Sequence, residues 1–141
     1  PRQYGISQQH KHLKEMKAIS QIENEPLFSP IVADFYSGME VTIPIFKKQL
    51  NEGFSIEDIR KIYKEKYTTD IVFYEENVDE SGFMCSNKFS GLDSMQISVN
   101  GNDDRILLIA RYDNLGKGAS GAALECMNIV IGNSPSYMLN I

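Results

Sequence analysis

The sequence predicts an α+β fold, and three kinds of local pattern support this prediction. Apolar residues three or four positions apart indicate amphipathic helices, because one face of a helix repeats about every 3.6 residues. Alternating apolar and polar residues between these segments indicate β-strands. An Asn-Gly pair at positions 100 and 101 separates two such strands and favours a hairpin. Helices and strands therefore alternate along one chain of 141 residues, which predicts a layered α+β architecture.

The first 46 residues are expected to contain a short helix and a strand. Tyr4 to Ser7 is strand-like, and Leu13 to Ser20 has an apolar residue at every third position, which indicates a short amphipathic helix. Residues 39 to 46 are rich in β-branched and apolar types and predict a strand. Pro44 lies within this strand and lacks a backbone N–H, which favours an edge strand or a strand end.

The middle of the chain predicts a capped helix followed by a strand. Ser55 can accept hydrogen bonds from the free amides of a helix that starts just after it, and the acidic first turn suits the positive end of the helix. The apolar face of this helix continues to about Lys66. Asp70 to Glu75 then alternates between polar and apolar residues, so it is expected to be a strand.

The last third predicts a hairpin and a final helix. Met95 to Val99 and Arg105 to Tyr112 are the two strands, and Asn100-Gly101 supplies a turn that tolerates positive φ. Lys117 to Ile131 is expected to be a helix, with Gly132-Asn133 placed to end it. The apolar stripe of this helix is predicted at four positions: Ala122, Cys126, Ile129 and Val130.

The composition is that of a globular protein. Hydrophobic residues make up 42% and charged residues 23% of the chain, which excludes disorder along its whole length. Fourteen Lys and Arg against 19 Asp and Glu give a net charge of -5, so the overall field repels polyanions and argues against nucleic-acid binding. The apolar runs are far shorter than the roughly 20 residues that cross a bilayer, so no membrane span is expected.

Several features concern the location and extent of the protein. Cys85 and Cys126 lie far apart, and no apolar signal segment is present, so a reduced, cytoplasmic protein is expected. No repeats or long linkers divide the chain, and residues 1–141 are expected to form a single domain. The chain opens on Pro1 without a methionine and enters a strand-like segment almost at once, which predicts that a longer protein continues upstream.

The two histidines of the chain, His10 and His12, flank Lys11 and precede the first helix. They are the side chains that titrate near neutral pH, which allows an acid/base or ligand role, although a solvated loop ahead of a helix is the commoner explanation of such a pair. Glu15 follows His12 by three residues and could hold an imidazole in one tautomer. No metal site is predicted, because no cysteine is near and a third ligand would have to come from elsewhere.

A glycine-rich segment, Asp113 to Gly121, leaves the last strand and enters the final helix. Such a turn can expose amides at a helix N-terminus and bind an anion, although a helix packed tightly through small residues would have the same pattern. Asn114 can both donate to and accept from an amide-bearing ligand.

The remaining candidate side chains are expected to be structural. Cys126 is predicted to be a small buried residue, and Cys85 has no base near it in the sequence. Aromatic residues at core spacing are expected to pack inside: Phe28, Phe35, Tyr36, Tyr63, Phe73 and Tyr74.

Taken together, the segments resemble the carboxy-terminal part of the N-acetyl-gamma-glutamyl-phosphate reductase family, the NADPH-dependent enzymes of arginine biosynthesis. Tyr4-Gly5-Ile6 leads to His10 to Met16, which is similar to the family's His-Arg-His-x-Pro-Glu-Ile. Phe28-Ser29-Pro30 follows, with Gly38 downstream. Asp113 to Gly121 is close to the family's Asp-Asn-Leu-x-Lys-Gly-Ala-x-Gly. Ser37 stands where many members have Arg, and Leu13-Lys14 replaces a residue-Pro pair.

The resemblance implies a fold and a missing partner domain. It implies a mixed, largely antiparallel sheet with helices packed on one face, like the C-terminal domain of glyceraldehyde-phosphate dehydrogenase-type enzymes. In that family a Rossmann domain precedes this part and contains both the catalytic cysteine and the nucleotide loop. The chain alone is therefore expected to be inactive, and it is expected to form a homo-oligomer.

The resemblance also implies roles for individual residues. His10 is expected to be the acid/base, with His12 as the rival candidate and Glu15 as the group that orients the imidazole. Lys11 is expected to meet an anionic group of the acyl-phosphate substrate. The cofactor NADP (NADPH) is expected to contact Asn114 through its carboxamide, and the turn at Lys117-Gly118 is expected to close over it.

Two other functions are compatible with the residues. One is a stand-alone α+β module whose glycine turn at 116 to 121 binds a small anionic metabolite. The other is an oligomerisation domain whose sheet pairs with a copy of itself, which the enzyme hypothesis already includes.

Overall fold

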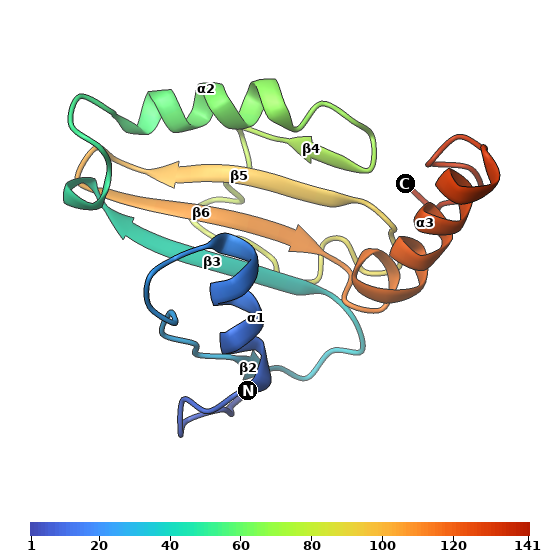
Figure 1. Cartoon of the computed structure of the whole chain (residues 1–141), viewed down its shortest axis with the longest axis horizontal. Coiled ribbons are helices and arrows are strands. Elements are labelled where there is room, and N and C mark those ends of the chain that lie inside the picture. The colour runs from blue at the N-terminus through green and yellow to red at the C-terminus, as the bar shows by residue number, and fades with distance from the viewer. The chain divides into compact units, whose positions relative to one another are not determined.

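A computed structural model describes all residues from Pro1 to Ile141. The chain forms two compact units, residues 1–36 and residues 37–141 (Figure 1). None of the helices is both long enough and apolar enough to cross a membrane.

The larger unit is built on a four-stranded sheet. Its strands are β3 (Met39–Phe46), β4 (Val72–Tyr74), β5 (Met95–Gly101) and β6 (Arg105–Tyr112). Their order in the sheet is β3-β6-β5-β4, in which only β4 and β5 are parallel. The mixed, largely antiparallel sheet of an α+β fold is thus confirmed. β3 lies at the edge, as Pro44 predicted, because an edge strand has one side on which no N–H is needed.

The hairpin of β5 and β6 is confirmed, but the predicted position of its turn is wrong. Asn100 and Gly101 both belong to β5 and pair with β6, and the loop spans residues 102 to 104. The side-chain oxygen of Asn102 accepts hydrogen bonds from the amides of Asp104 and Arg105, both at 3.0 Å. This side chain closes the turn by a local hydrogen bond, so the Asn-Gly pair is free to extend the strand.

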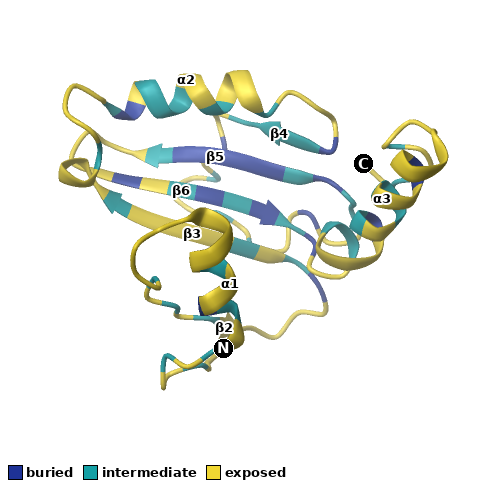
Figure 2. Cartoon of the chain, in the orientation of Figure 1, coloured by how far each residue is buried: buried dark blue, intermediate teal, exposed yellow.

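The helix α2 (Ile56–Lys66) begins after Ser55, as predicted. The Ser55 hydroxyl accepts from the amide of Asp58, while the Asp58 carboxylate accepts from the amide of Ser55. The helix packs on the sheet, where Ile56 joins Val99 and Ile106 in the buried core (Figure 2). β4 is shorter than the predicted 70 to 75, because the Thr69 hydroxyl bonds to the backbone of Val72 and forms a tight turn there.

The C-terminal segment differs from the single helix predicted over 117 to 131. A π-helical turn, Gly116–Ser120, precedes α3 (Gly121–Ile131), which Gly132 ends with φ 81°. The predicted apolar stripe is not covered within the chain, since Ile129 is 57% and Val130 84% exposed. Cys126 is also exposed, so its prediction as a small buried residue is wrong.

Residues 1–36 contain β1 (Arg2–Gln3), α1 (Lys11–Ser20) and β2 (Ile31–Val32), with β1 and β2 antiparallel. The strand predicted at Tyr4 to Ser7 is wrong: the backbone turns there, with Gly5 at φ 63°, and the amide of Gln8 donates to the carbonyl of Gly5 at 3.0 Å.

Two predicted core aromatics are also not buried. Tyr36 is 91% and Phe35 40% exposed, so the prediction that both pack inside is wrong. By contrast, Tyr63 and Tyr74 pack against the core under α2, as predicted. The remaining short element, a 3-10 turn over Lys47–Gln49, follows β3.

Candidate active site

The predicted site residues fall in both units. His10, Lys11, His12 and Glu15 lie in residues 1–36, and Asn114, Lys117 and Gly118 lie in residues 37–141.

His10 is the N-cap residue of α1, with extended backbone at φ -72° and ψ 140°. Its ring atom Nδ1 accepts a hydrogen bond from the backbone amide of His12 at 3.3 Å. An imidazole that accepts through Nδ1 has its proton on Nε2 when neutral. The helix start therefore selects one tautomer of His10 and leaves Nε2 as the nitrogen that can donate.

Aromatic rings surround the imidazole of His10. The centroid of the Phe28 ring lies 5.1 Å away and that of Tyr4 5.9 Å away. The ring of His12 is 4.6 Å from His10 in an edge-on arrangement. Contacts on several sides restrict the ring, so both the position and the tautomer of His10 are defined by its neighbours.

His12 and Glu15 form the second part of this group. Nε2 of His12 lies 4.0 Å from a carboxylate oxygen of Glu15, one helical turn later, and the two side chains are 45% and 62% exposed. Glu15 is thus close to His12, whereas the backbone amide of His12 orients His10. Lys11, the first residue of α1, is exposed and is free to meet an anion.

In the larger unit the turn after β6 is organised by the carboxylate of Asp113, which is 2% exposed. One oxygen accepts from the amides of Leu115 (2.7 Å) and Gly116 (3.1 Å). The other accepts from the hydroxyl of Ser37 (2.9 Å) and from the amide of Gly91. Burial by itself would raise the pKa of Asp113, but these hydrogen bonds outweigh it and hold the pKa below its usual value.

Asn114 follows Asp113 and is exposed. Its side-chain oxygen accepts from the amide of Gly38 at 3.0 Å, which directs the NH₂ group away from Gly38 and leaves it free to donate. Gly38 has φ 118°, and a Cβ there would lie 2.5 Å from the Cα of Asn87, so only glycine fits. The close packing of Gly38 against Asn87 holds the Gly38 amide in place, and this amide orients the side chain of Asn114.

Lys117 and Gly118 are engaged within the chain. The ammonium of Lys117 pairs with the carboxylate of Glu125 at 2.5 Å, and the Lys117 side chain is 12% exposed. The amide of Gly118 donates to the carbonyl of Asp113 at 2.8 Å. Because Leu115, Gly116 and Gly118 all donate inside the turn, they are not available to an anion, and this removes donors that the anion-binding module would need.

A second buried polar group, centred on Arg111 and not predicted from the sequence, supports the loop between β4 and β5. Arg111 is 1% exposed and donates to Gln96 at 2.9 and 2.6 Å, to Glu80 at 3.1 Å and to the carbonyl of Cys85 at 3.2 Å. Hydrogen bonds from Lys88 and then from Arg111 lower the pKa of Glu80. Arg111 lies two residues after the buried Ile109, and residues two apart in a strand share a face of the sheet. This spacing could have revealed that Arg111 is buried.

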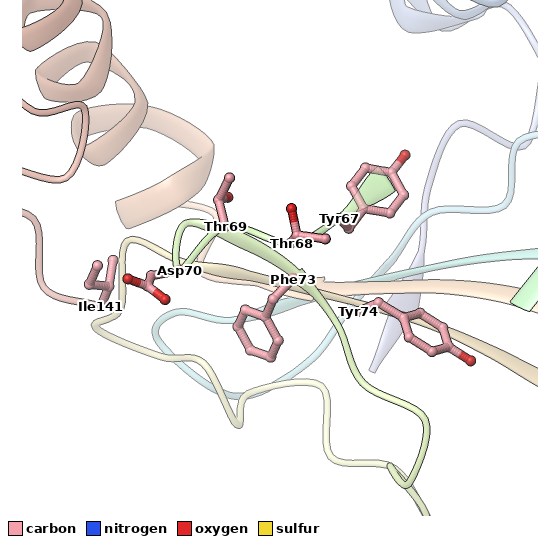
Figure 3. Close-up of a pocket in the computed structure, with 7 residues that line it drawn as sticks. All are labelled: Tyr67, Thr68, Thr69, Asp70, Phe73, Tyr74 and Ile141. Carbon is pink, nitrogen blue, oxygen red and sulfur yellow. The ribbon is translucent and has the colours of Figure 1, made fainter. Parts of the chain in front are cut away.

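A hollow of the surface lies elsewhere in the larger unit. Figure 3 shows it beside the start of β4, with the Thr68 and Thr69 hydroxyls on one side and Asp70 beside the last residue, Ile141. It contains none of the predicted site residues. No group of three or more His, Cys, Asp or Glu side chains is arranged to hold a metal ion.

The structure defines an α+β domain built on a mixed, largely antiparallel sheet. The family model described as "Semialdehyde dehydrogenase, dimerisation domain" matches residues 1–114, and the chain belongs to this family. It is also similar to proteins named N-acetyl-gamma-glutamyl-phosphate reductase. That of Brucella suis is 35% identical over 135 residues, that of Sinorhizobium medicae 35% over 133 and that of Brucella ovis 34% over 134.

These alignments cover most of this chain but less than half of each relative. They span 92% of this chain in the Brucella suis comparison and 91% in the Sinorhizobium medicae comparison, and 43% of the relative in both. The chain thus corresponds in length to a part of such a protein.

Proposed function

We propose that this chain is the sheet and dimerisation part of an NADPH-dependent reductase that converts N-acetyl-glutamyl phosphate to N-acetyl-glutamate semialdehyde and phosphate, in arginine biosynthesis. One observation is central to the proposal: relatives with this one name align with more than nine-tenths of the chain at 34 to 35% identity. The arrangement of His10 supports it, because a histidine with a defined tautomer is suited to proton transfer.

In this proposal the nucleophilic cysteine belongs to the half of the protein that the chain does not include. The thiolate displaces phosphate from the acyl carbon, and two electrons then reduce the thioester to the aldehyde and release the thiolate. NADPH, when bound, supplies the hydride. His10 provides the proton balance: its Nε2–H donates to the oxygen on which negative charge develops, and Nε2 takes the proton back as the carbonyl re-forms and the thiolate leaves.

The residues after β6 fit one group of the cofactor. A nicotinamide has a carboxamide oxygen that needs a donor, and Asn114 has a free NH₂ group held in a fixed orientation. Asn114 would therefore hold the carboxamide. Contacts from Lys117 and Gly118 remain part of the proposal, although both residues also bond within the turn.

The proposal includes a setting for the whole protein. Residues 1–141 act as one domain that joins an upstream nucleotide-binding half, and two or more copies associate through the dimerisation domain, whose family name supports this. The enzyme works in the cytoplasm. Without the upstream half the chain lacks the nucleophilic cysteine of the reaction and is inactive. Lys11 meets an anionic group of the substrate.

The reverse reaction tests the proposal. The full-length gene product is incubated with N-acetyl-glutamate semialdehyde, phosphate and NADP⁺, and NADPH formation is followed at 340 nm. Formation of NADPH that requires both the semialdehyde and phosphate is the expected result. An absence of activity in both directions, with a folded protein, would rule the proposal out.

Asn114→Asp is expected to weaken cofactor binding without disturbing the turn. The substitution keeps the oxygen that accepts from Gly38 and replaces the NH₂ donor by a second carboxylate oxygen, which cannot donate to the carboxamide. Loss of one hydrogen bond of about 1 kcal/mol predicts a rise of roughly 3- to 10-fold in the KM for NADPH, with little change in the KM for the acyl phosphate. Steady-state kinetics of the full-length protein measures both. An equal rise in the two KM values would contradict the assignment of Asn114.

A further inference from the structure

We propose that Gln8 is a positioning residue, which holds the ring of Phe28 against the imidazole of His10. Its consequence for catalysis rests on the proposed function, in which His10 transfers a proton. Gln8 has no titratable group and does not contact the imidazole itself, and it acts through the backbone of Phe28.

The side-chain amide of Gln8 forms hydrogen bonds with the backbone of Phe28, 20 residues away in the sequence. Nε2 donates to the carbonyl of Phe28 at 2.7 Å, and Oε1 accepts from the amide of Phe28 at 2.9 Å. Nε2 also donates to the carbonyl of Gly5 at 3.2 Å. A side-chain amide that bonds to both the N–H and the C=O of one residue takes the place of a neighbouring strand.

The backbone of Gln8 is shaped for this contact. Its φ is 54°, in the left-handed region that residues other than glycine seldom adopt. The turn from Gly5 to Gln8 is closed by a backbone hydrogen bond of 3.0 Å, which places Gln8 two residues before the N-cap of α1. The same short turn therefore determines both where the Gln8 amide reaches and where His10 begins the helix.

Few other hydrogen bonds hold the segment around Phe28. It has no regular secondary structure before β2 begins at Ile31, and its neighbour Leu27 is 92% exposed. The next hydrogen bond along this segment is the one that the amide of Tyr4 donates to the carbonyl of Pro30, at 3.1 Å. The two hydrogen bonds from Gln8 thus fix the position and orientation of the Phe28 backbone. The centroid of the Phe28 ring lies 5.1 Å from that of His10 and 6.3 Å from that of His12.

The chain offers a matched control beside Gln8. Gln9 has the same side chain and is exposed, and no side-chain hydrogen bond involves it. Gln8→Glu removes both donors and places a carboxylate beside the carbonyls of Phe28 and Gly5, whereas Gln9→Glu adds the same charge to solvent. Gln8→Asn, which is one methylene shorter, serves as a milder second variant in case Gln8→Glu does not fold.

The first readout is the environment of His10 in the full-length gene product labelled with ¹³C at histidine Cε1. His10→Asn assigns the resonance, and Phe28→Leu measures how much of its shift comes from the Phe28 ring. At pH 8 we expect Gln8→Glu to move the His10 resonance toward its position in Phe28→Leu and Gln9→Glu to leave it at the wild-type position.

The second readout is kinetic. Displacement of the acid/base lowers the rate of the chemical step and leaves the affinity for the cofactor unchanged. Gln8→Glu should therefore lower kcat by about 10- to 100-fold with an unchanged KM for NADPH. The kcat of Gln9→Glu should stay within about 2-fold of the wild-type value. A wild-type protein without reductase activity would defeat the proposed function, while the resonance would still decide the position of Phe28. The inference is overturned if the His10 resonance of both Gln8 variants stays at the wild-type position, or if it moves while kcat does not change.

Discussion

His10→Asn lowers the kcat of the full-length reductase by about 10² to 10⁴, the usual contribution of a general acid or base. Asparagine is a suitable replacement because it is a good N-cap residue, and its side-chain oxygen can accept from the amide of His12 as Nδ1 of His10 does. The start of α1 is thus preserved, and the proton-transferring ring is removed. Steady-state rates of wild type and variant at pH 7 measure the loss.

His12→Asn is the matched comparison. His12 lies inside the first turn of α1 beside Glu15, and both side chains are largely open to solvent. We therefore expect a smaller loss of kcat than for His10→Asn. The reverse order would assign the acid/base role to His12, with Glu15 as the carboxylate that orients it. Equal and small effects in both variants would contradict an acid/base role for this histidine pair.

Asp113→Asn destabilises the chain by about 3 kcal/mol. The carboxylate accepts four hydrogen bonds while almost completely buried, and an amide in its place turns one acceptor into a donor that faces other donors. Hydrogen bonds to a charged group contribute about 1.5 to 3 kcal/mol each, so the loss of two of them is large. Urea unfolding at pH 7, followed by circular dichroism, measures the free energy of unfolding.

The effect of Asp113 depends on pH in a defined direction. Its pKa in the folded chain is lowered, so its stabilising contribution is complete above the usual aspartate pKa of about 4 and is lost as the pH falls through the lowered folded value. Wild type and Asp113→Asn should therefore converge below about pH 4. Asp103→Asn, in the exposed hairpin loop, is the control and should change the free energy of unfolding by less than about 0.5 kcal/mol. A constant difference between wild type and Asp113→Asn from pH 7 to pH 3 would contradict the argument.

Much of the fold could be predicted because its determinants are local. The cap of α2 depends on Ser55 and Asp58, three residues apart, and the strand at 39 to 46 depends on its own residue types. The predicted turn at Asn100-Gly101 is wrong because the local pattern allows a turn but does not require one. Pairing with β6 extends the strand through Gly101, and Asn102 closes the turn instead. Cys126 was misjudged because helical spacing shows which residues share a face but not whether anything covers that face.

The sequence by itself determined the α+β class, most of the helices and strands, and the concentration of both histidines before the first helix, because each is encoded within about ten neighbouring residues. Only the tertiary structure decided which atoms of those residues are in use. Nδ1 of His10 is occupied by the backbone of His12, Gln8 reaches Phe28 across 20 residues and Ser37 reaches Asp113 across 76. Such partners depend on how the chain folds back on itself, and a hydrogen bond between distant residues leaves no periodic pattern along the sequence.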